Sequence, residues 1–588
     1  MFDVRLVKNS NKIFYIFFCL FVLGAAAKAQ VPDPKFQRQT DTIFRQEQEL
    51  EKRKDLPTEI PKSLIKKKED KKTSGTGASI SVKEFKFEGE IKAVSLETLN
   101  DLVKEFVGKS LSFEELQSVV KIVNDYYKDK GYFLANAVLP KQEVKNGTVI
   151  IFINEGKLDS KEPYKINKEN LRIPEDRVKA YVDDAFKDGL TQQSLERALL
   201  NLNDNPGVSS TANVEAGSEP GTSRILIDIT EAPLFTGSAT IDNYGSRYTG
   251  DFRGTLSLNL NNPSTYGDVL NVTEVKGYQS DFTSKKVSYE FPIGVSGLRA
   301  GASYNELNYG LFKELLTDPK STGKGESYNA NVKYPIFRSG LNSLMVSANY
   351  DKKKSVSTAT GITTSDKVLD NYNAGLTYQN TDQLFGGGFT QLSGVVTKGK
   401  LDLSKSSSSL TDDQDVDGAK TNGNFTKENF QILRIQRGTE RLSFQFLADA
   451  QIANKNLDSS EKFSLGGPTG VRAYPGGEGS GDEGYKVSLD AKYSLITGSD
   501  FGDVLGSVFY DYGKVRQFKD TGMIAMTTPN HFALSGWGVG LDLVASGKYS
   551  VKVGWAHVLG GNSGSSTGLD GDGRNESSRY WLLATTSF

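Results

Sequence analysis

Apolar and polar residues alternate through residues 233–588, and this pattern predicts about sixteen antiparallel β-strands. Thr255–Leu260, Lys286–Phe291, Leu442–Phe446 and Tyr485–Tyr493 are examples. Because successive side chains of a strand point to opposite faces, each of these strands has an apolar side and a polar side. An even number of such strands is typical of a barrel that crosses the outer membrane around a polar lumen.

The connections between these segments alternate between short and long ones. Short turns on one side and long loops on the other are typical of the periplasmic and extracellular faces of an outer-membrane barrel. The chain ends with a further strand pattern and Phe588, similar to the assembly signal of such barrels. A soluble β-repeat protein is the alternative. The short connections include 294–297 and 338–340, and the long ones include 311–323, 403–423, 454–484 and 560–578.

Residues 1–29 have the features of a secretory signal peptide, with basic residues, an apolar run over 13–27 and small residues before Gln30. That run is short for a membrane span, which disfavours an N-terminal anchor. The single cysteine, Cys19, lies within it. The mature chain is therefore predicted to have no thiol and no disulfide.

Residues 30–55 are polar except for a narrow stripe in which Phe36, Ile43 and Leu50 recur every seven residues. This spacing predicts a helix. A helix of about 20 residues is about 30 Å long, which is enough to traverse a barrel. Residues 56–80 are predicted to form a flexible linker, because the stretch from Leu56 to Gly77 is rich in lysine and ends in glycine.

Residues 81–158 and 159–232 each combine two helices with short alternating strands. In the first segment, a capping box at Ser112–Glu115 opens a helix, and Asn146-Gly147 marks a tight hairpin after a strand over 135–144. Both segments resemble polypeptide-transport-associated (POTRA) domains. The second carries predicted helices over 174–187 and 191–203 and predicted strands over 209–215 and 224–230.

An open sheet edge in these two domains can bind an extended polypeptide by strand addition, since main-chain hydrogen bonds require no particular side chain. Alternatively, the domains only space the barrel from other parts of the cell envelope.

The long connection at 454–484 contains a glycine-rich stretch, Leu465–Gly484, that cannot form a helix or a ladder. Part of it resembles the signature loop of outer-membrane transporters of two-partner secretion. Ala473 departs from that family, which usually has glycine at this position. The residues that carry the resemblance are Val471, Arg472, Ala473, Tyr474 and Pro475, followed by Gly481, Asp482 and Gly484.

The resemblance implies that the helix at 30–55 plugs the lumen, although a helix loosely attached in the periplasm is the alternative. It also implies that the loop folds back into the barrel and that Arg472 forms a salt bridge with Asp511. Asp511 belongs to a strand motif with Phe509 and Gly513, whose alternation places all three on one face, and the resemblance implies that this face lines the lumen. Otherwise, Arg472 is a solvated loop residue and Asp511 only lines the lumen.

Charge and motif content exclude several other functions. The chain has 71 Lys+Arg and 72 Asp+Glu, so no basic field indicates nucleic-acid binding. Residues 476–481 lack the Lys-Ser/Thr of a nucleotide loop, and His531 and His557 lack metal-ligand spacing. Residues 413–418 open like a calcium loop without its final glutamate. We expect no catalytic residues, no cofactor and no metal.

The sequence therefore predicts a monomeric transporter in the outer membrane of a Gram-negative-type bacterium, with its POTRA domains in the periplasm. Its expected partners are an unfolded secreted exoprotein, outer-membrane lipid and the barrel-assembly machinery that inserts it. The alternatives are an insertase of the same superfamily and a passive porin or receptor.

Overall fold

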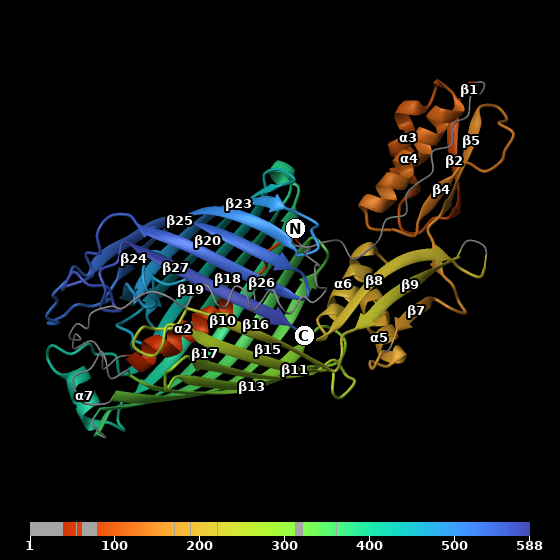
Figure 1. The fold of residues 1–588 in the computed structure, drawn as a ribbon. Coiled ribbons are helices and arrows are strands. Elements are labelled where there is room, and N and C mark those ends of the chain that lie inside the picture. Colours follow the sequence, from red (N-terminus) through yellow and green to blue (C-terminus); the bar gives the residue numbers. More distant parts are fainter. Residues whose placement is uncertain are drawn as a thin grey trace, which may run out of the picture.

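The computed structural model describes residues 39–54, 56–60, 79–169, 171–187, 190–219, 222–311, 321–359 and 362–588. The predicted signal peptide at 1–29 lies outside the described residues, as do residues 30–38 of the predicted helix and residues 61–78 of the predicted linker. Figure 1 shows a barrel with a helix inside it and two small α+β domains beyond one of its ends.

Sixteen antiparallel strands form a closed barrel, because the first strand pairs with the last. This confirms the predicted barrel. The strands are β10 (Phe235–Asp242), β11 (Arg253–Asn261), β12 (Val269–Gly277), β13 (Thr283–Pro292), β14 (Arg299–Gly310), β15 (Ser321–Arg338), β16 (Asn342–Ala359), β17 (Ile362–Asp382), β18 (Gly388–Asp402), β19 (Gly423–Arg437), β20 (Leu442–Ala453), β23 (Glu483–Ile496), β24 (Asp503–Arg516), β25 (His531–Ala545), β26 (Tyr549–Val558) and β27 (Ser578–Ser587).

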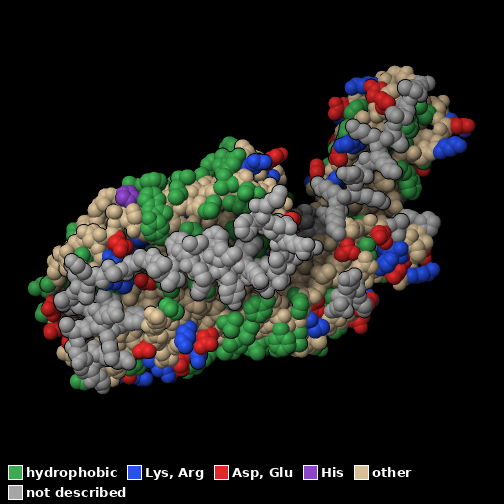
Figure 2. All heavy atoms as spheres, in the orientation of Figure 1, with side chains coloured by type: hydrophobic (Ala, Val, Ile, Leu, Met, Phe, Trp, Pro, Cys, Tyr) green, Lys and Arg blue, Asp and Glu red, His purple; other side chains and the backbone are tan. Residues whose placement is uncertain are grey.

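Hydrophobic side chains gather on the outer face of the barrel wall, on the half nearer the two small domains (Figure 2). Lipid requires this apolar band, which is about 25 Å tall in outer-membrane barrels. Strands such as β16 and β17 are longer than the band, with 18 and 21 residues, and extend past it on the other side. Examples of exposed outward side chains are Leu256, Leu258, Val332, Phe430, Phe444 and Trp537.

The long connections lie at the barrel end opposite the small domains, where α7 (Ser407–Gln414) is found (Figure 1). The short turns face the small domains, and one of them contains the 3-10 helix η4 (Leu384–Gly386). Among the helices that the structure describes, none combines the length and apolar character needed to cross a bilayer.

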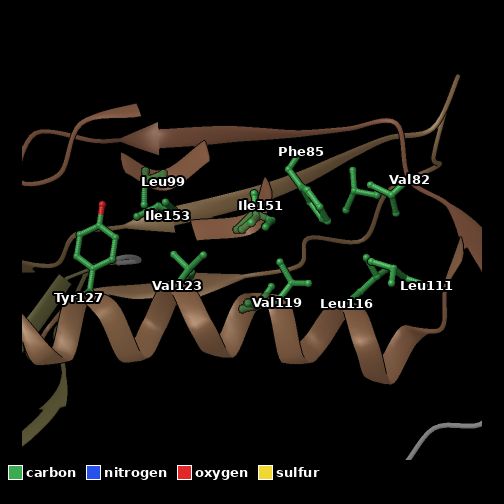
Figure 3. Packing of buried hydrophobic residues seen from close by; sticks show 14 residues of the cluster. Val82, Phe85, Leu99, Leu111, Leu116, Val119, Val123, Tyr127, Ile151 and Ile153 are labelled. Carbon is green, nitrogen blue, oxygen red and sulfur yellow. The ribbon is translucent and has the colours of Figure 1, made fainter. Parts of the chain in front are cut away.

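The first small domain, the first POTRA domain, packs two helices on a sheet with the order β2-β5-β4. Figure 3 shows its core, in which Val119, Val123 and Tyr127 of the second helix lie against Ile151 and Ile153 of the central strand. Its elements are β1 (Ile80–Ser81), β2 (Glu84–Glu90), α3 (Leu96–Val103), η2 (Lys104–Phe106), β3 (Ser110–Leu111), α4 (Phe113–Asp129), β4 (Asn136–Val138) and β5 (Thr148–Asn154).

Two local predictions for this domain have different outcomes. The capping box is confirmed, since the Ser112 and Glu115 side chains each accept a hydrogen bond from the other residue's backbone N–H. The strand expected over 135–144 is wrong in length, because β4 ends at Val138. Beyond it, the Gln142 side chain takes the place of a strand and bonds both the N–H and the C=O of Ile150.

The second POTRA domain has its own apolar core between two helices and a sheet around β9. It contacts the short turns of the barrel: Asp204 pairs with Arg338 and Glu196 accepts a hydrogen bond from the N–H of Gly340. These contacts place the domain at the barrel mouth. Its elements are β6 (Lys157–Leu158), β7 (Tyr164–Glu169), α5 (Glu175–Phe186), α6 (Gln192–Asn203), β8 (Val208–Ala216) and β9 (Thr222–Glu231).

Candidate functional site

The loop between β20 and β23 folds into the barrel as a small hairpin. Its arms pair through β21 (Phe463–Ser464) and β22 (Ser480–Gly481). The loop residues Leu465, Val471 and Ala473 are fully buried. They pack on side chains from the barrel wall, which include Phe509, Val515, Phe532 and Leu534.

Arg472 lies at the tip of this hairpin and binds two carboxylates of the barrel wall. Its Nε and Nη2 donate to Asp511 at 2.8 and 2.7 Å, and its Nη1 and Nη2 donate to Asp490 at 2.8 and 3.2 Å. Ser488 donates to Asp511 and accepts from Arg472. The guanidinium carbon lies 3.4 Å from the centre of the Phe509 ring. The guanidinium group therefore contacts four side chains of the barrel wall: two carboxylates, one hydroxyl and one aromatic ring.

Burial by itself lowers the pKa of the Arg472 guanidinium, but Asp511 and Asp490 outweigh this effect and hold that pKa above its ordinary value. The Asp511 and Asp490 side chains are 1% and 10% exposed. The main chain of the tip is fixed as well, because Trp581 donates its indole N–H to the Arg472 carbonyl at 2.7 Å.

Asp490 was missing from the residues expected at this site. Sequence signals for it exist: it belongs to the alternating run 485–493, in which Lys486, Ser488 and Asp490 share one polar face. What the sequence lacks is the register of β23 against β24, which places Asp490 directly opposite Phe509.

Two glycines of the wall make room for the loop. A Cβ on Gly513 would lie 2.6 Å from a methyl group of Leu465, and one on Gly536 would lie 2.5 Å from the Ala473 methyl group. Gly536 therefore compensates for alanine at the position where the resemblance suggested glycine. Tyr474 and Pro475 complete the buried tip.

The base of the loop is closed by Asp482. Its buried carboxylate accepts hydrogen bonds from the N–H groups of Leu457 and Lys519 and pairs with Lys462 at 2.7 Å. Gly481 lies against the Arg516 carbonyl, where a Cβ would approach to 2.4 Å. Gly484, expected in the loop, lies in β23, where the ladder to β24 has already begun.

A second anchor ties the loop to other strands of the wall, β16, β17 and β19. Glu461 pairs with Lys353 at 2.9 Å and with Lys427 at 2.8 Å, and Asp458 pairs with Lys367 at 2.8 Å. Burial raises the pKa of Glu461, but the two lysines outweigh it and leave that pKa well below its usual range. The sequence did not predict this anchor, because no local motif links these residues.

The helix α2 (Gln39–Lys54) lies in the lumen and contacts both the wall and the loop (Figure 1). Arg45 donates to the carbonyls of Ser459 and Lys462 and to the Ser480 hydroxyl. Ile43 is buried in an apolar cluster that includes Leu307. Four ion pairs and one hydrogen bond join the helix to five strands. The ion pairs are Glu47 with Arg253, Glu51 with Lys286, Glu49 with Lys486 and Arg53 with Asp449, and the hydrogen bond is donated by Lys353 to Gln48.

The acidic loop and one of the histidines that the sequence raised as possible ligands form hydrogen bonds within the protein. Both oxygens of the Asp413 carboxylate accept hydrogen bonds from the loop itself, at Thr421 and Asn422. The Nδ1 atom of His557 lies 2.8 Å from the Ser578 hydroxyl. Across the described ranges, no group of three or more His, Cys, Asp or Glu residues could hold a metal ion.

Comparison with known proteins agrees with this architecture. The family model described as haemolysin secretion/activation protein ShlB/FhaC/HecB matches residues 221–543, and the model for the ShlB-type POTRA domain matches residues 80–156.

Curated relatives match most of the chain. The heme/hemopexin transporter protein HuxB of Haemophilus influenzae (strain 86-028NP) is 26% identical over 516 residues, covering 84% of this chain and 85% of HuxB. The outer membrane transporter CdiB of Escherichia coli O6:K15:H31 (strain 536 / UPEC) is 24% identical over 533 residues, covering 88% and 87%.

The solved structure of CdiB from Escherichia coli has the same fold, with a TM-score of 0.68 and 19% identity over 95% of this chain and all of that chain. The sequence-based assignment is thus confirmed by matches that span both the barrel and the POTRA region. The chain belongs to the haemolysin secretion/activation (ShlB/FhaC/HecB) family and is an outer-membrane transporter of two-partner secretion, with its POTRA domains in the periplasm.

Proposed function

We propose that this transporter captures one unfolded exoprotein with its POTRA domains and passes it through its own barrel after α2 has left the lumen. The observation that carries this proposal is the way α2 is held. Apart from the packing of Ile43, the contacts described above between α2 and the barrel are ion pairs and hydrogen bonds, and water that enters the lumen can solvate these groups once the helix has left. Folding of the exoprotein outside the cell supplies the driving force in this proposal.

The closed barrel leaves no strand edge for a second copy, which supports a monomer. Its apolar outer face supports contact with outer-membrane lipid, and the terminal strand β27 is the segment we expect the barrel-assembly machinery to recognise. The domain limits that we assign are 1–29 for the signal peptide, 30–55 for the plug helix, 56–80 for the linker, 81–158 and 159–232 for the POTRA domains, and 233–588 for the barrel.

One of the two edge strands of the first POTRA domain, β4, is closed to strand addition by an asparagine. Asn124 of α4 accepts a hydrogen bond from the N–H of Ala137 at 2.6 Å and donates to its C=O at 2.9 Å. Ala137 is the middle residue of β4, and its neighbours pair with β5. The groups that an incoming strand would bind at this edge are therefore already used.

The second POTRA domain has the same arrangement over only one part of its edge. Asn203 of α6 bonds the N–H and C=O of Ser210 at 2.6 and 3.2 Å. The N–H and C=O groups of Ser210 point away from β9. Because this direction alternates along an antiparallel strand, the N–H and C=O groups of Ala212 and Val214 point away from β9 as well. No hydrogen bond between described residues uses the outward groups of these two. Because Ala212 is fully buried, we propose that an extended segment of the exoprotein pairs with β8 at Val214–Ala216.

Deletion of the gene tests the overall proposal. We expect one or two large proteins to disappear from the culture medium, while the other barrels of the outer membrane remain at their normal levels. Quantitative proteomics of both fractions measures this. A broad decline of outer-membrane barrels would instead indicate an insertase, and an unchanged medium would contradict export of an exoprotein.

Removal of α2 tests the plug. A chain that lacks residues 39–54 should fold, because every barrel strand pairs without the helix, and its lumen should conduct ions better. Planar-bilayer conductance and entry of large antibiotics measure this. Glu59→Gln, an exposed position beyond the helix, is the matched control and should leave conductance unchanged. Equal conductance of the deletion and the intact protein would contradict a plugging role.

A further inference from the structure

The lumen wall carries an apolar strip near its periplasmic end, formed by four inward-facing side chains of β18, β19 and β20. Phe389 lies opposite Ile435 in the first ladder, and Leu433 lies opposite Leu447 in the second. None of the four is more than 6% exposed. The strip therefore extends across three neighbouring strands close to the turns that face the POTRA domains.

Residues 56–60 of the chain itself cover this strip. Leu56 and Ile60 pack against it, while Thr58 and Glu59 between them are exposed. This segment is not helical. It lies on the wall as an irregular peptide whose two apolar side chains point toward the strip. The sequence predicted only a flexible linker here, because the apolar partners lie more than 300 residues away in the chain.

The cover is attached to the plug. Residue 55 alone separates Leu56 from the end of α2, and Arg53 of that helix donates to Asp449 at 2.6 Å. Asp449 lies two residues beyond Leu447, on the same face of β20. Departure of α2 therefore withdraws Leu56 and Ile60, and the strip then faces the lumen.

The surroundings of the strip are polar, with Gln391, Gln445 and Asp449 as inward-facing neighbours on the same strands. An apolar strip in such a wall attracts apolar side chains from water without fixing their direction or sequence. A polypeptide that enters from the POTRA domains must pass this end of the lumen first.

We infer that the strip of Phe389, Leu433, Ile435 and Leu447 is a transient binding site for apolar side chains of the exported polypeptide, a site that Leu56 and Ile60 occupy at rest. The inference rests on the proposed function, in which the exoprotein passes through this lumen. Apolar contacts suit such a site, because a moving chain can exchange them without breaking directional bonds.

Two pairs of substitutions in the full-length protein separate this role from simple anchoring of the plug. Leu433→Asn with Ile435→Asn should lower secretion about tenfold, the effect of losing roughly one buried apolar side chain. Leu56→Asn with Ile60→Asn should raise conductance and leave secretion undiminished. If the strip only anchored residues 56–60, both pairs would raise conductance and neither would lower secretion, which would overturn the inference.

Cross-linking gives a second readout that does not depend on the polar pair folding. A photo-reactive amino acid replaces Leu433 in one protein and Val395, an inward-facing residue of β18 outside the strip, in a control. The probe is the protein that disappears from the medium when the gene is deleted. We expect adducts with this protein at position 433 in secreting cells and few at 395. Equal yields at both positions, or none at 433, would contradict a preferred contact.

If gene deletion removes no protein from the medium, the proposed function itself fails. If a protein is lost but forms no adduct at position 433, only the strip fails. The two results are therefore distinguishable.

Discussion

Replacement of Arg472 by alanine should abolish or strongly reduce secretion and destabilise the barrel. The guanidinium is the only partner cation that the structure gives to Asp511 among its described residues, and the substitution leaves two shielded carboxylates, Asp511 and Asp490, facing each other. Removing one partner from a buried pair typically costs about 3–5 kcal/mol, whereas an exposed pair contributes at most about 1 kcal/mol. The amount of secreted exoprotein measures the effect on secretion, and the heat-modifiability of the barrel measures the effect on its stability.

The variants around Arg472 should follow a definite order. Asp511→Ala should cost less than Arg472→Ala, because Asp490 still balances the guanidinium. Arg472→Lys should not be silent, since an ammonium group cannot reproduce the planar contacts with two carboxylates and the Phe509 ring.

The double variant Arg472→Ala/Asp511→Ala should cost much less than the sum of the single changes, because it removes the charge that the first change leaves unpaired. Additive costs of the two changes, or full secretion by Arg472→Ala, would contradict a coupling between Arg472 and Asp511.

A proline at Val214 should block secretion without harming the barrel. The N–H of Val214 points away from β9, so proline removes one donor that an added strand would use and leaves the β8–β9 ladder intact. One main-chain hydrogen bond contributes about 1 kcal/mol, and with the clash of the ring we expect roughly tenfold weaker capture. The amount of secreted exoprotein and the level of inserted barrel are measured in the same cells.

Val214→Ala is the matched control, because it shortens the side chain and keeps the N–H group. It should secrete normally. Asn203→Ala should also secrete, since it only frees the outward groups of Ser210. Normal secretion by Val214→Pro, in a chain whose second POTRA domain resists proteolysis, would reassign that domain to spacing.

The difference between the two POTRA edges illustrates what lies beyond sequence patterns. The sequence predicts helices and short strands in both domains, and it places Asn124 and Asn203 on helices without assigning them a role. The side chain of each asparagine forms hydrogen bonds with the backbone of one later residue, at a point where the chain has already reversed direction. Only the packing of helix on sheet decides which backbone groups lie within its reach.

The alternating pattern of the sequence predicted the barrel and its polar lumen, and the resemblance of the loop motif to a known family predicted the inward loop and the partnership of Arg472 with Asp511. Alternation with a period of two is a local property of each strand, and the loop motif is a local string. The tertiary structure decided the rest: Asp490 as a second carboxylate, the anchor of Glu461 on two lysines, and Leu56 and Ile60 on the wall. These contacts join residues of distant strands and segments across a lumen. Their distances depend on the register and closure of the whole barrel, which no single stretch of sequence contains.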